Sequence, residues 1–466
     1  MVLGQVVGAR KRNRSGTATA MVAAGLLAVA FLAWGALRLG PEIGVEIASD
    51  RPAVGPATTV QATFREPRKG LGAIRLELVQ GDRVVVLAEE RFQRPGPFAL
   101  FSRGPRAEAV LSAVVGRQAQ PFLREGELAV RAVAERITGP LRSGRTAVAE
   151  IRMTVGFRPP PLTIVSDQHY VRQGGSGIVV FRTDESAVRA GVRTAGVEHS
   201  SWPLPGGAPG ERFSLFGIPW DLADAGKVRV FVEDAAGNRA ESRFLSQLRQ
   251  RPVRRDTIQI QDTFLERVVP AITARTPEVQ FTGSLLDQYL LINGELRRRN
   301  LAVVADLAGS TSPVFLWSGP FVQLPNSQRR AGFAETRDYL YDGRVVDRQT
   351  HLGLDLASVA QAPVPAANAG RVVFAGWLGI YGHTVVLDHG IGLMSLYGHL
   401  SEIAVTPGQA AAAGTIVGRT GVSGLAGGDH LHLEVFVNGV SVDPMEWLDG
   451  RWIRAALHGK VPMPGF

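Results

Sequence analysis

The 466-residue sequence contains no cysteine, which excludes both disulfide bonds and thiolate metal sites. It also lacks the motifs that are typical of DNA or RNA recognition. With 45% hydrophobic and 20% charged residues, the composition is ordinary for a folded protein and excludes a disordered or fibrous class. Any metal site in this chain must therefore be built from histidine and carboxylate side chains.

Glycine and proline are abundant, with 54 and 28 residues, and this favours many short strands joined by turns over long helices. The chain is longer than the size at which one hydrophobic core usually stops growing, so we expect several domains. The net charge of +9 favours an acidic partner, which is nucleic acid, anionic lipid or a carboxylate-bearing wall polymer. Charge alone does not choose among these three.

An uncharged stretch from Ser15 to Leu37 follows four basic residues in the first 14 positions. About 20 apolar residues suffice to cross a membrane, and the flanking positive charge holds its side in the cytoplasm. We expect a cytoplasmic basic tail over residues 1–14 and a single-pass inner-membrane anchor over residues 15–38, with the bulk periplasmic or extracytoplasmic. A cleaved signal peptide is the alternative, since Ala28-Val29-Ala30 has the form of a cleavage site. With either an anchor or a signal peptide, the bulk of the chain is exported, and nucleic acid is excluded as its partner.

Two regions with alternating apolar and polar residues follow the N-terminus. The alternation runs from residue 42 to 158, as in Ile74-Arg75-Leu76-Glu77-Leu78, and indicates strands with one buried face. Pro159-Pro160-Pro161 marks a boundary, and a second strand-rich region covers residues 162–246. We expect a β-sandwich-like domain and then an immunoglobulin-like domain. A spacer role and a wall- or partner-binding role are both open for them.

The pattern changes between residues 251 and 345. Thr263 and Glu266 have the spacing of a capping box, and Ser284 to Arg299 carries apolar residues at helical spacing. We expect a helical connecting segment here, which either joins its neighbours or covers the site that follows it.

Short strands return from residue 346 to 450, closely punctuated by glycine, and predict a compact all-β domain. Six of the nine histidines lie between His351 and His432, which directs attention to a metal site. A catalytic zinc site usually takes three protein ligands and keeps one position open. The helical His-Glu-x-x-His signature is absent, because no glutamate follows His351.

Two pairs of residues have spacings that suit metal binding. His430 and His432 are two positions apart, so both imidazoles project from the same face of a strand. Glu434 continues that face and is placed to accept an imidazole N–H. A spacing of four also brings His351 and Asp355 to one face. Each pair alone has an ordinary structural explanation, either a solvated strand face or a hydrogen-bonded pair.

His399 adds a third element, and together the three closely resemble the lysostaphin-like (LytM-type) zinc metallopeptidases. The matching stretches, within residues 345–450, are HLGLDLA, YGHTVVLDHG, SLYGHLS and TGVSGLAGGDHLHLEV. The resemblance implies a Zn²⁺ ion bound by His351, Asp355 and His432. It places His399 and His430 beside the metal-bound water as the catalytic acid–base residues. The sequence does not reveal which of the two is the acid and which is the base.

The resemblance further implies an endopeptidase that hydrolyses peptide cross-links of bacterial peptidoglycan, with wall peptide stems as its partners. Family relatives that lack ligands activate other wall enzymes, so the alternative is a non-catalytic protein that activates or recruits a wall amidase. The complete ligand set argues against that alternative. The expected fold is mainly β and multidomain, with the N-terminal transmembrane helix, two immunoglobulin-like sandwich regions, a short helical segment and the C-terminal peptidase domain.

This chain departs from the family pattern in two places. His383 stands where asparagine is usual, and the turn of small residues before His430 is longer than usual. Neither departure removes a ligand. Tyr397 is a candidate donor to an oxyanion. The remaining histidines are interpreted as structural or surface residues, namely His169, His199, His383, His389 and His458. The sequence does not indicate an oligomeric state.

Overall fold

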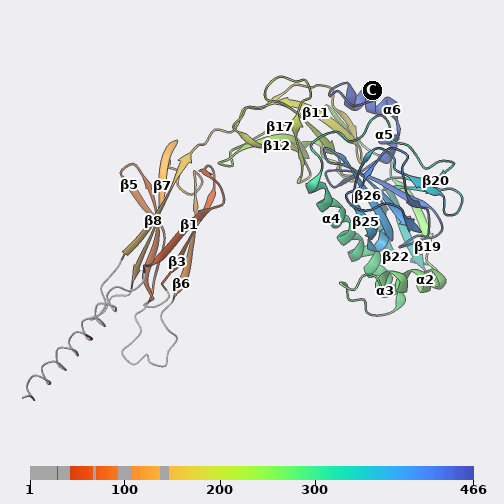
Figure 1. Cartoon of the computed structure of the whole chain (residues 1–466), viewed down its shortest axis with the longest axis horizontal. Helices are drawn as coiled ribbons and strands as arrows, with labels where there is room; N and C mark the ends of the chain where they lie inside the picture. Colours follow the sequence, from red (N-terminus) through yellow and green to blue (C-terminus); the bar gives the residue numbers. More distant parts are fainter. Residues whose placement is uncertain (1–28, 30–41, 67–69, 93–106, 137–145, 466) are drawn as a thin grey trace, which may run out of the picture. The chain divides into compact units, whose positions relative to one another are not determined.

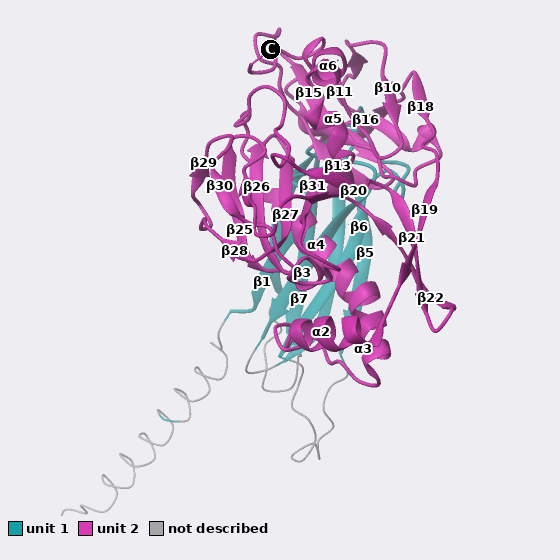
Figure 2. Ribbon diagram, turned by 90° about the vertical axis from the view of Figure 1, so that its right-hand side faces the viewer, with its two compact units in different colours: residues 1–158, 235–238 teal, residues 159–234, 239–466 magenta. Residues whose placement is uncertain are grey.

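The computed structural model describes residues 42–66, 70–92, 107–136 and 146–465, together with Val29. The chain divides into two compact units, residues 1–158 with 235–238 and residues 159–234 with 239–466 (Figures 1 and 2). The membrane anchor expected over residues 15–38 lies outside the described residues, apart from Val29. Within the described ranges, no helix combines the length and the apolar character needed to cross a membrane.

The first unit consists of two sheets that enclose one hydrophobic core. The alternation in the sequence has the expected effect: in β3 (Thr58–Arg65), Val60, Ala62 and Phe64 are fully buried, and the residues between them face outward. One sheet has the order β1 (Gly44–Ser49), β3, β6 (Glu108–Val115). The other has the order β2 (Ala53–Val54), β8 (Thr146–Val155), β7 (Gly126–Arg136), β4 (Leu71–Gln80), β5 (Arg83–Arg91).

The second unit begins with another pair of sheets, packed around Val179, Phe181, Phe216 and Val230. The first has the order β14 (Trp202–Pro203), β15 (Glu211–Gly217), β11 (Ser176–Arg182), β9 (Thr163–Ile164). The second has the order β13 (Val197–Ser200), β12 (Ala187–Thr194), β16 (Val228–Asp234), β17 (Arg239–Ser242). A short 3₁₀ turn covers Ala225–Lys227, and β10 (Tyr170–Arg172) pairs with β18 (Gln247–Arg249).

The segment expected to be helical contains helices and also strands that the sequence did not reveal. Its helical elements are α2 (Asp262–Thr273), α3 (Leu285–Leu291), a π-helical stretch (Ile292–Leu296), α4 (Arg297–Leu307) and a 3₁₀ turn (Ala308–Ser310). Strands β19 (Arg254–Gln259), β21 (Glu335–Tyr341) and β22 (Arg344–His351) form a separate sheet. β19 runs parallel to β21 although about eighty residues separate them, a pairing that leaves no local pattern in the sequence.

The predicted helix start at Thr263 and Glu266 is wrong. Helix α2 begins at Asp262, so its N-cap is Gln261, two residues before Thr263, and Gln261 makes no side-chain capping bond. The capping box belongs to α3, where Ser284 and Asp287 bond each other's backbone N–H groups.

The C-terminal region is built on a large sheet that carries the strands predicted there. Its order is β20 (Gln328–Ala331), β23 (Leu354–Ala357), β31 (Leu431–Val437), β27 (Leu393–Leu400), β26 (His383–Gly390), β25 (Gly370–Trp377), β29 (Ala410–Ala411), and β32 (Val440–Val442) pairs with β31. A small sheet has the order β24 (Pro363–Pro365), β30 (Ile416–Arg419), β28 (Glu402–Ile403). A 3₁₀ turn (Gly379–Tyr381), two short helices, α5 (Pro444–Leu448) and α6 (Gly450–Ile453), and a π-helical turn (Arg454–His458) complete the region.

Strands β27 and β31 are buried along their whole length, which explains their nearly continuous apolar sequence. One face packs into a core with Tyr397, Leu433 and Val435. The other face contributes Leu396 and Phe436 to a core shared with α2, α3 and α4. The helical segment therefore covers one face of the sheet that carries the paired histidines, and it is part of the same unit.

Candidate metal centre

The three predicted ligands meet at one end of the large sheet. His351 is the last residue of β22, Asp355 lies in β23, and His432 lies in β31 directly opposite Asp355 in the strand register. Gly353 makes the turn between the first two possible, because a Cβ at this position would lie 2.7 Å from His432 Cε1. The side chains of all three are largely buried.

The facing atoms of this His351–Asp355–His432 cluster form a nearly equilateral triangle. His351 Nε2 lies 2.9 Å from Asp355 Oδ1 and 3.1 Å from His432 Nδ1, and that nitrogen lies 3.0 Å from Asp355 Oδ1. Zinc with bonds of about 2.0–2.1 Å to such ligands has tetrahedral edges of about 3.3 Å. The cluster offers three ligand atoms in a suitable arrangement, and two nitrogens and one carboxylate oxygen are donors that zinc accepts.

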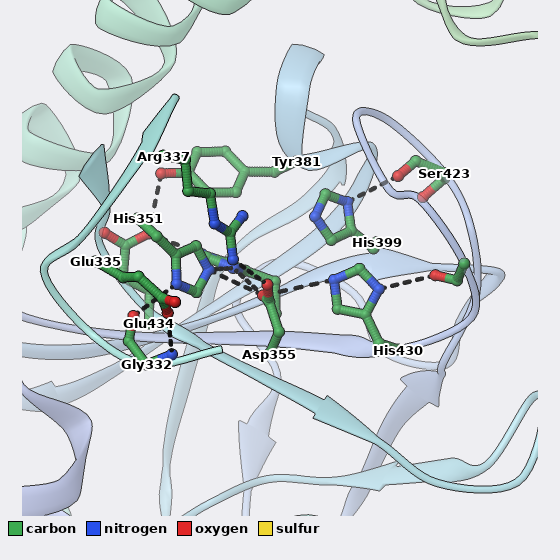
Figure 3. A network of polar contacts seen from close by, with 12 residues as sticks. Gly332, Glu335, Arg337, His351, Asp355, Tyr381, His399, Ser423, His430 and Glu434 are labelled. Atoms are coloured by element: carbon green, nitrogen blue, oxygen red, sulfur yellow. Dashed lines mark hydrogen bonds and ion pairs between the residues drawn. The ribbon is translucent and has the colours of Figure 1, made fainter. Parts of the chain in front are cut away.

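Both imidazoles of the cluster are oriented by a second hydrogen bond, and Figure 3 shows the one that His351 makes. Nδ1 of His351 lies 2.9 Å from the carbonyl oxygen of Gly332, and Nε2 of His432 lies 3.3 Å from Glu434 Oε2. In a neutral imidazole, donation of the outer N–H group leaves a lone pair on the inner nitrogen, facing the centre of the triangle. Glu434 thus accepts an imidazole N–H, as its spacing from His432 along the strand indicated.

The electrostatics of the cluster reflect burial and close charge partners. Burial lowers the pKa of His351. Burial also lowers the pKa of His432, but its contacts with Asp355 and Glu434 outweigh this effect and raise it to about 9. For Asp355, burial raises the pKa, whereas the surrounding histidines lower it well below its usual value. The carboxylate is therefore ionised at neutral pH and available to a cation.

Arg337 is a member of this site that the sequence did not point to. It lies in β21, and its NH2 group donates a 2.8 Å hydrogen bond to Asp355 Oδ2, so Oδ1 alone faces the two imidazoles (Figure 3). The Nε–H of Arg337 is buried, and within the described part of the chain it has no hydrogen-bond partner. An arginine in a strand of mixed composition carries no local signal of such a role.

His399 and His430 lie together beside the cluster. Their ring centroids are 4.9 Å apart, and the His399 ring is 5.7 Å from that of His432. Nδ1 of His399 lies 2.8 Å from the carbonyl oxygen of Ser423, and Nδ1 of His430 lies 2.8 Å from that of Gly428. These contacts leave Nε2 of each ring for other partners. His430 Nε2 is 3.5 Å from Asp355 Oδ1.

When the sequence is compared with known protein families, residues 349–444 match Peptidase family M23. This part of the chain is therefore an M23 domain. The resemblance to lysostaphin-like peptidases is thereby confirmed.

Relatives of the M23 domain include both peptidases and an activator. The DD-carboxypeptidase/endopeptidase Mpg of Neisseria meningitidis is 37% identical over 95 residues, which are 20% of this chain and 22% of that protein. The murein hydrolase activator EnvC of Escherichia coli is 38% identical over 96 residues, which are 21% of this chain and 23% of EnvC. The match thus spans less than a quarter of either relative. The catalytic domain of lysostaphin from Staphylococcus simulans is 30% identical, with a TM-score of 0.23 over 27% of this chain and 94% of that domain.

The M23 domain supplies only part of the cleft around the His351–Asp355–His432 cluster. The cleft has a volume of about 540 Å³, and its lining includes the five predicted site residues, His351, Asp355, His399, His430 and His432. The other wall comes from the segment before the domain, from α2 to α4 and from β19 to β21. Helical and strand residues between 256 and 339 therefore face any molecule that reaches the cluster.

Tyr397, the candidate oxyanion donor, does not line the cleft. Tyr397 receives the N–H of Ala367 at 2.7 Å and the hydroxyl of Ser395 at 2.9 Å, inside the core. His399, two residues further along, has a left-handed backbone (φ 61°) that interrupts the strand alternation, so the two side chains do not share a strand face. The tyrosines that line the cleft are Tyr289, Tyr339 and Tyr381, and the Tyr381 hydroxyl donates to Glu434 at 2.9 Å.

The five histidines that were interpreted as structural are not among the described residues that line the cleft. His389 is fully buried between the Ala369 carbonyl group and the Ser395 hydroxyl, at 2.7 Å from each. His383 lies 2.9 Å from an Arg275 guanidinium nitrogen. His169 and His199 contact Ser166 and Thr194, and His458 accepts the N–H of Met463.

Proposed function

We propose that this chain is a zinc-dependent endopeptidase that hydrolyses peptide cross-links of bacterial peptidoglycan. The observation that carries the proposal is the triangle of His351, Asp355 and His432 in one cleft with two further histidines. The M23 match and the relatives named as endopeptidases support the same activity.

His351 Nε2, Asp355 Oδ1 and His432 Nδ1 are the proposed zinc ligands. When bound there, zinc polarises a peptide carbonyl and lowers the pKa of water toward about 7. Two neutral imidazoles and one carboxylate leave the centre with a net positive charge, which favours the developing oxyanion. Gly332, Glu434 and Arg337 hold the three ligands in place through the hydrogen bonds described above.

His399 and His430 are the proposed acid–base pair. Burial and the two nearby imidazoles lower the pKa of His399 well below its usual value, so His399 is neutral and its Nε2 can accept a proton. His430 lies at the more open side of the cleft, with 15% of its side chain exposed. We propose that His399 takes the proton from the attacking water and that His430 gives a proton to the leaving amine.

We further propose an inner-membrane location, with the M23 domain on the outer side. The basic residues before the uncharged stretch from Ser15 to Leu37 support this orientation. Separating the membrane and soluble fractions of cells that express the full chain tests it. Recovery of the intact chain in the membrane fraction is expected, and a shortened soluble chain contradicts the anchor.

The second candidate is an activator of a wall amidase, which the similarity to EnvC favours. The test is digestion of purified dye-labelled wall by the full chain, with no amidase added. Zinc-dependent release of dye, lost with a chelator and restored by Zn²⁺, supports the peptidase. An inert zinc-loaded chain that stimulates an added amidase supports the activator instead.

A further inference from the structure

The wall of the cleft that lies outside the M23 domain is positively charged. It presents three arginines, Arg297 from α4, Arg330 from β20 and Arg337 from β21. The aspartates of the cleft are Asp256 and Asp355. Arg337 is already bound to Asp355, so Arg297 and Arg330 remain as charges that the cluster does not use.

Arg297 is fixed in orientation by its own helix. Its Nε donates to the carbonyl oxygen of Asn293 at 3.1 Å, and its NH2 donates to the side-chain oxygen of the same residue at 2.6 Å. Asn293 is held in turn by Asp347, at 2.7 Å. Arg297 directly follows the π-helical stretch Ile292–Leu296, an irregularity that occurs often at functional sites. The guanidinium is therefore preorganised, which lowers the entropic cost of binding an anion.

Arg330 is directed by an irregularity of a different kind. Its neighbours Arg329 and Ala331 pair with Leu356 and Asp355, and the register shifts between them, so Arg330 is the extra residue of a bulge. A bulge changes the direction of a side chain and is common beside active sites. Arg330 is exposed and lines the cleft from the edge of the sheet that carries Asp355.

We propose that Arg297 and Arg330 bind a free carboxylate of the substrate beside the cleaved peptide bond. Guanidinium groups pair with carboxylates through two parallel hydrogen bonds, a geometry that a neutral amide does not match. The chain then selects anionic cross-link peptides over neutral ones such as oligoglycine. This inference rests on the proposed endopeptidase activity and adds the substrate class to it.

The test uses two synthetic cross-linked peptides that differ only in a free carboxylate or a carboxamide beside the cleaved bond. The variants are Arg297→Gln and Arg330→Gln in the full chain. Arg298→Gln and Arg329→Gln are matched controls, since both are exposed neighbours and, among the described residues, neither lines the cleft. Two quantities are measured: the ratio of kcat/KM for the two peptides, and the equilibrium binding of each peptide to zinc-depleted protein.

The unchanged chain is expected to prefer the carboxylate peptide at least tenfold in both measurements. Each cleft variant reduces this preference to threefold or less, mainly by a loss on the carboxylate peptide, and keeps its zinc content. The control variants keep the full preference. Equal binding of the two peptides by the unchanged chain overturns the inference, as does an equal loss for both peptides in the variants. If neither peptide is cleaved, the proposed activity fails, and the binding measurement still decides the carboxylate selectivity.

Discussion

Replacing His432 and His430 separately by alanine distinguishes a metal ligand from an acid–base residue. The two side chains lie two residues apart, yet His432 contributes a nitrogen to the triangle with Asp355 and His351, whereas His430 stands outside it. In the proposed site, loss of His432 removes one ligand of three. Loss of His430 leaves the three proposed ligands and their supporting hydrogen bonds in place.

The two substitutions are expected to have very different effects on zinc affinity. Protein zinc sites with four ligands bind with roughly 10–16 kcal/mol, so one ligand accounts for about 3–4 kcal/mol, or a factor of about 10² to 10³ in affinity. We expect that loss from His432→Ala, with His351→Ala and Asp355→Ala behaving alike. His430→Ala should keep the zinc affinity within about tenfold and lose about 10²- to 10⁴-fold in activity, as expected for an acid–base group.

Both quantities are measured on the same preparations. Zinc content is determined by mass spectrometry of the metal after dialysis against graded concentrations of a chelator, and activity is followed as dye release from labelled wall. His458→Ala is the control, since this histidine lies in the C-terminal turn, and it should preserve both. Equal loss of zinc from His430→Ala and His432→Ala would refute the division of roles.

Three further predictions concern the scaffold. Gly353→Ala places a methyl group 2.7 Å from the His432 ring and should lower zinc affinity at least tenfold in the same dialysis. Gly427→Ala is the control: among the described residues there is open space around Gly427, so this substitution should leave zinc affinity unchanged. Ser284→Ala removes the cap of α3 and should cost about 1 kcal/mol in urea unfolding; an unchanged midpoint contradicts the cap. Burial raises the pKa of Glu446 from 4.5 to about 8, so the folded chain keeps a proton that the unfolded chain releases. Stability should therefore fall as pH rises from about 4.5 to 8, by at most about 1.4 kcal/mol per pH unit, and Glu446→Gln should remove this component.

The five residues that the sequence brings together do lie in one cleft. The spacing of His430 and His432 in a strand and the resemblance around His351 and Asp355 led to five residues that line one cleft. Strand spacing alone did not decide which imidazole faces Asp355. The register does so, since His432 pairs with Asp355 inside the sheet while His430 lies just before the start of β31.

Features set by distant segments were not predictable in the same way. Arg337 reaches Asp355 because β21 is placed between β19 and β22, and no periodicity in residues 251–345 indicates that sheet. His399 lines the cleft and Tyr397 does not, because the left-handed backbone of His399 breaks the strand alternation between them. The helix start at Thr263 was misplaced for a related reason, since hydroxyl and carboxylate spacing alone does not fix where the backbone turns.

Mass spectrometry of the fragments released from purified wall sacculi shows whether the zinc-loaded chain cuts peptide cross-links. We expect separated peptide stems with a new amino terminus and a new carboxyl terminus, formed by the unchanged chain and absent with a chelator or with His432→Ala. Intact cross-links in the presence of bound zinc, or products cut only between sugar and peptide, would contradict it.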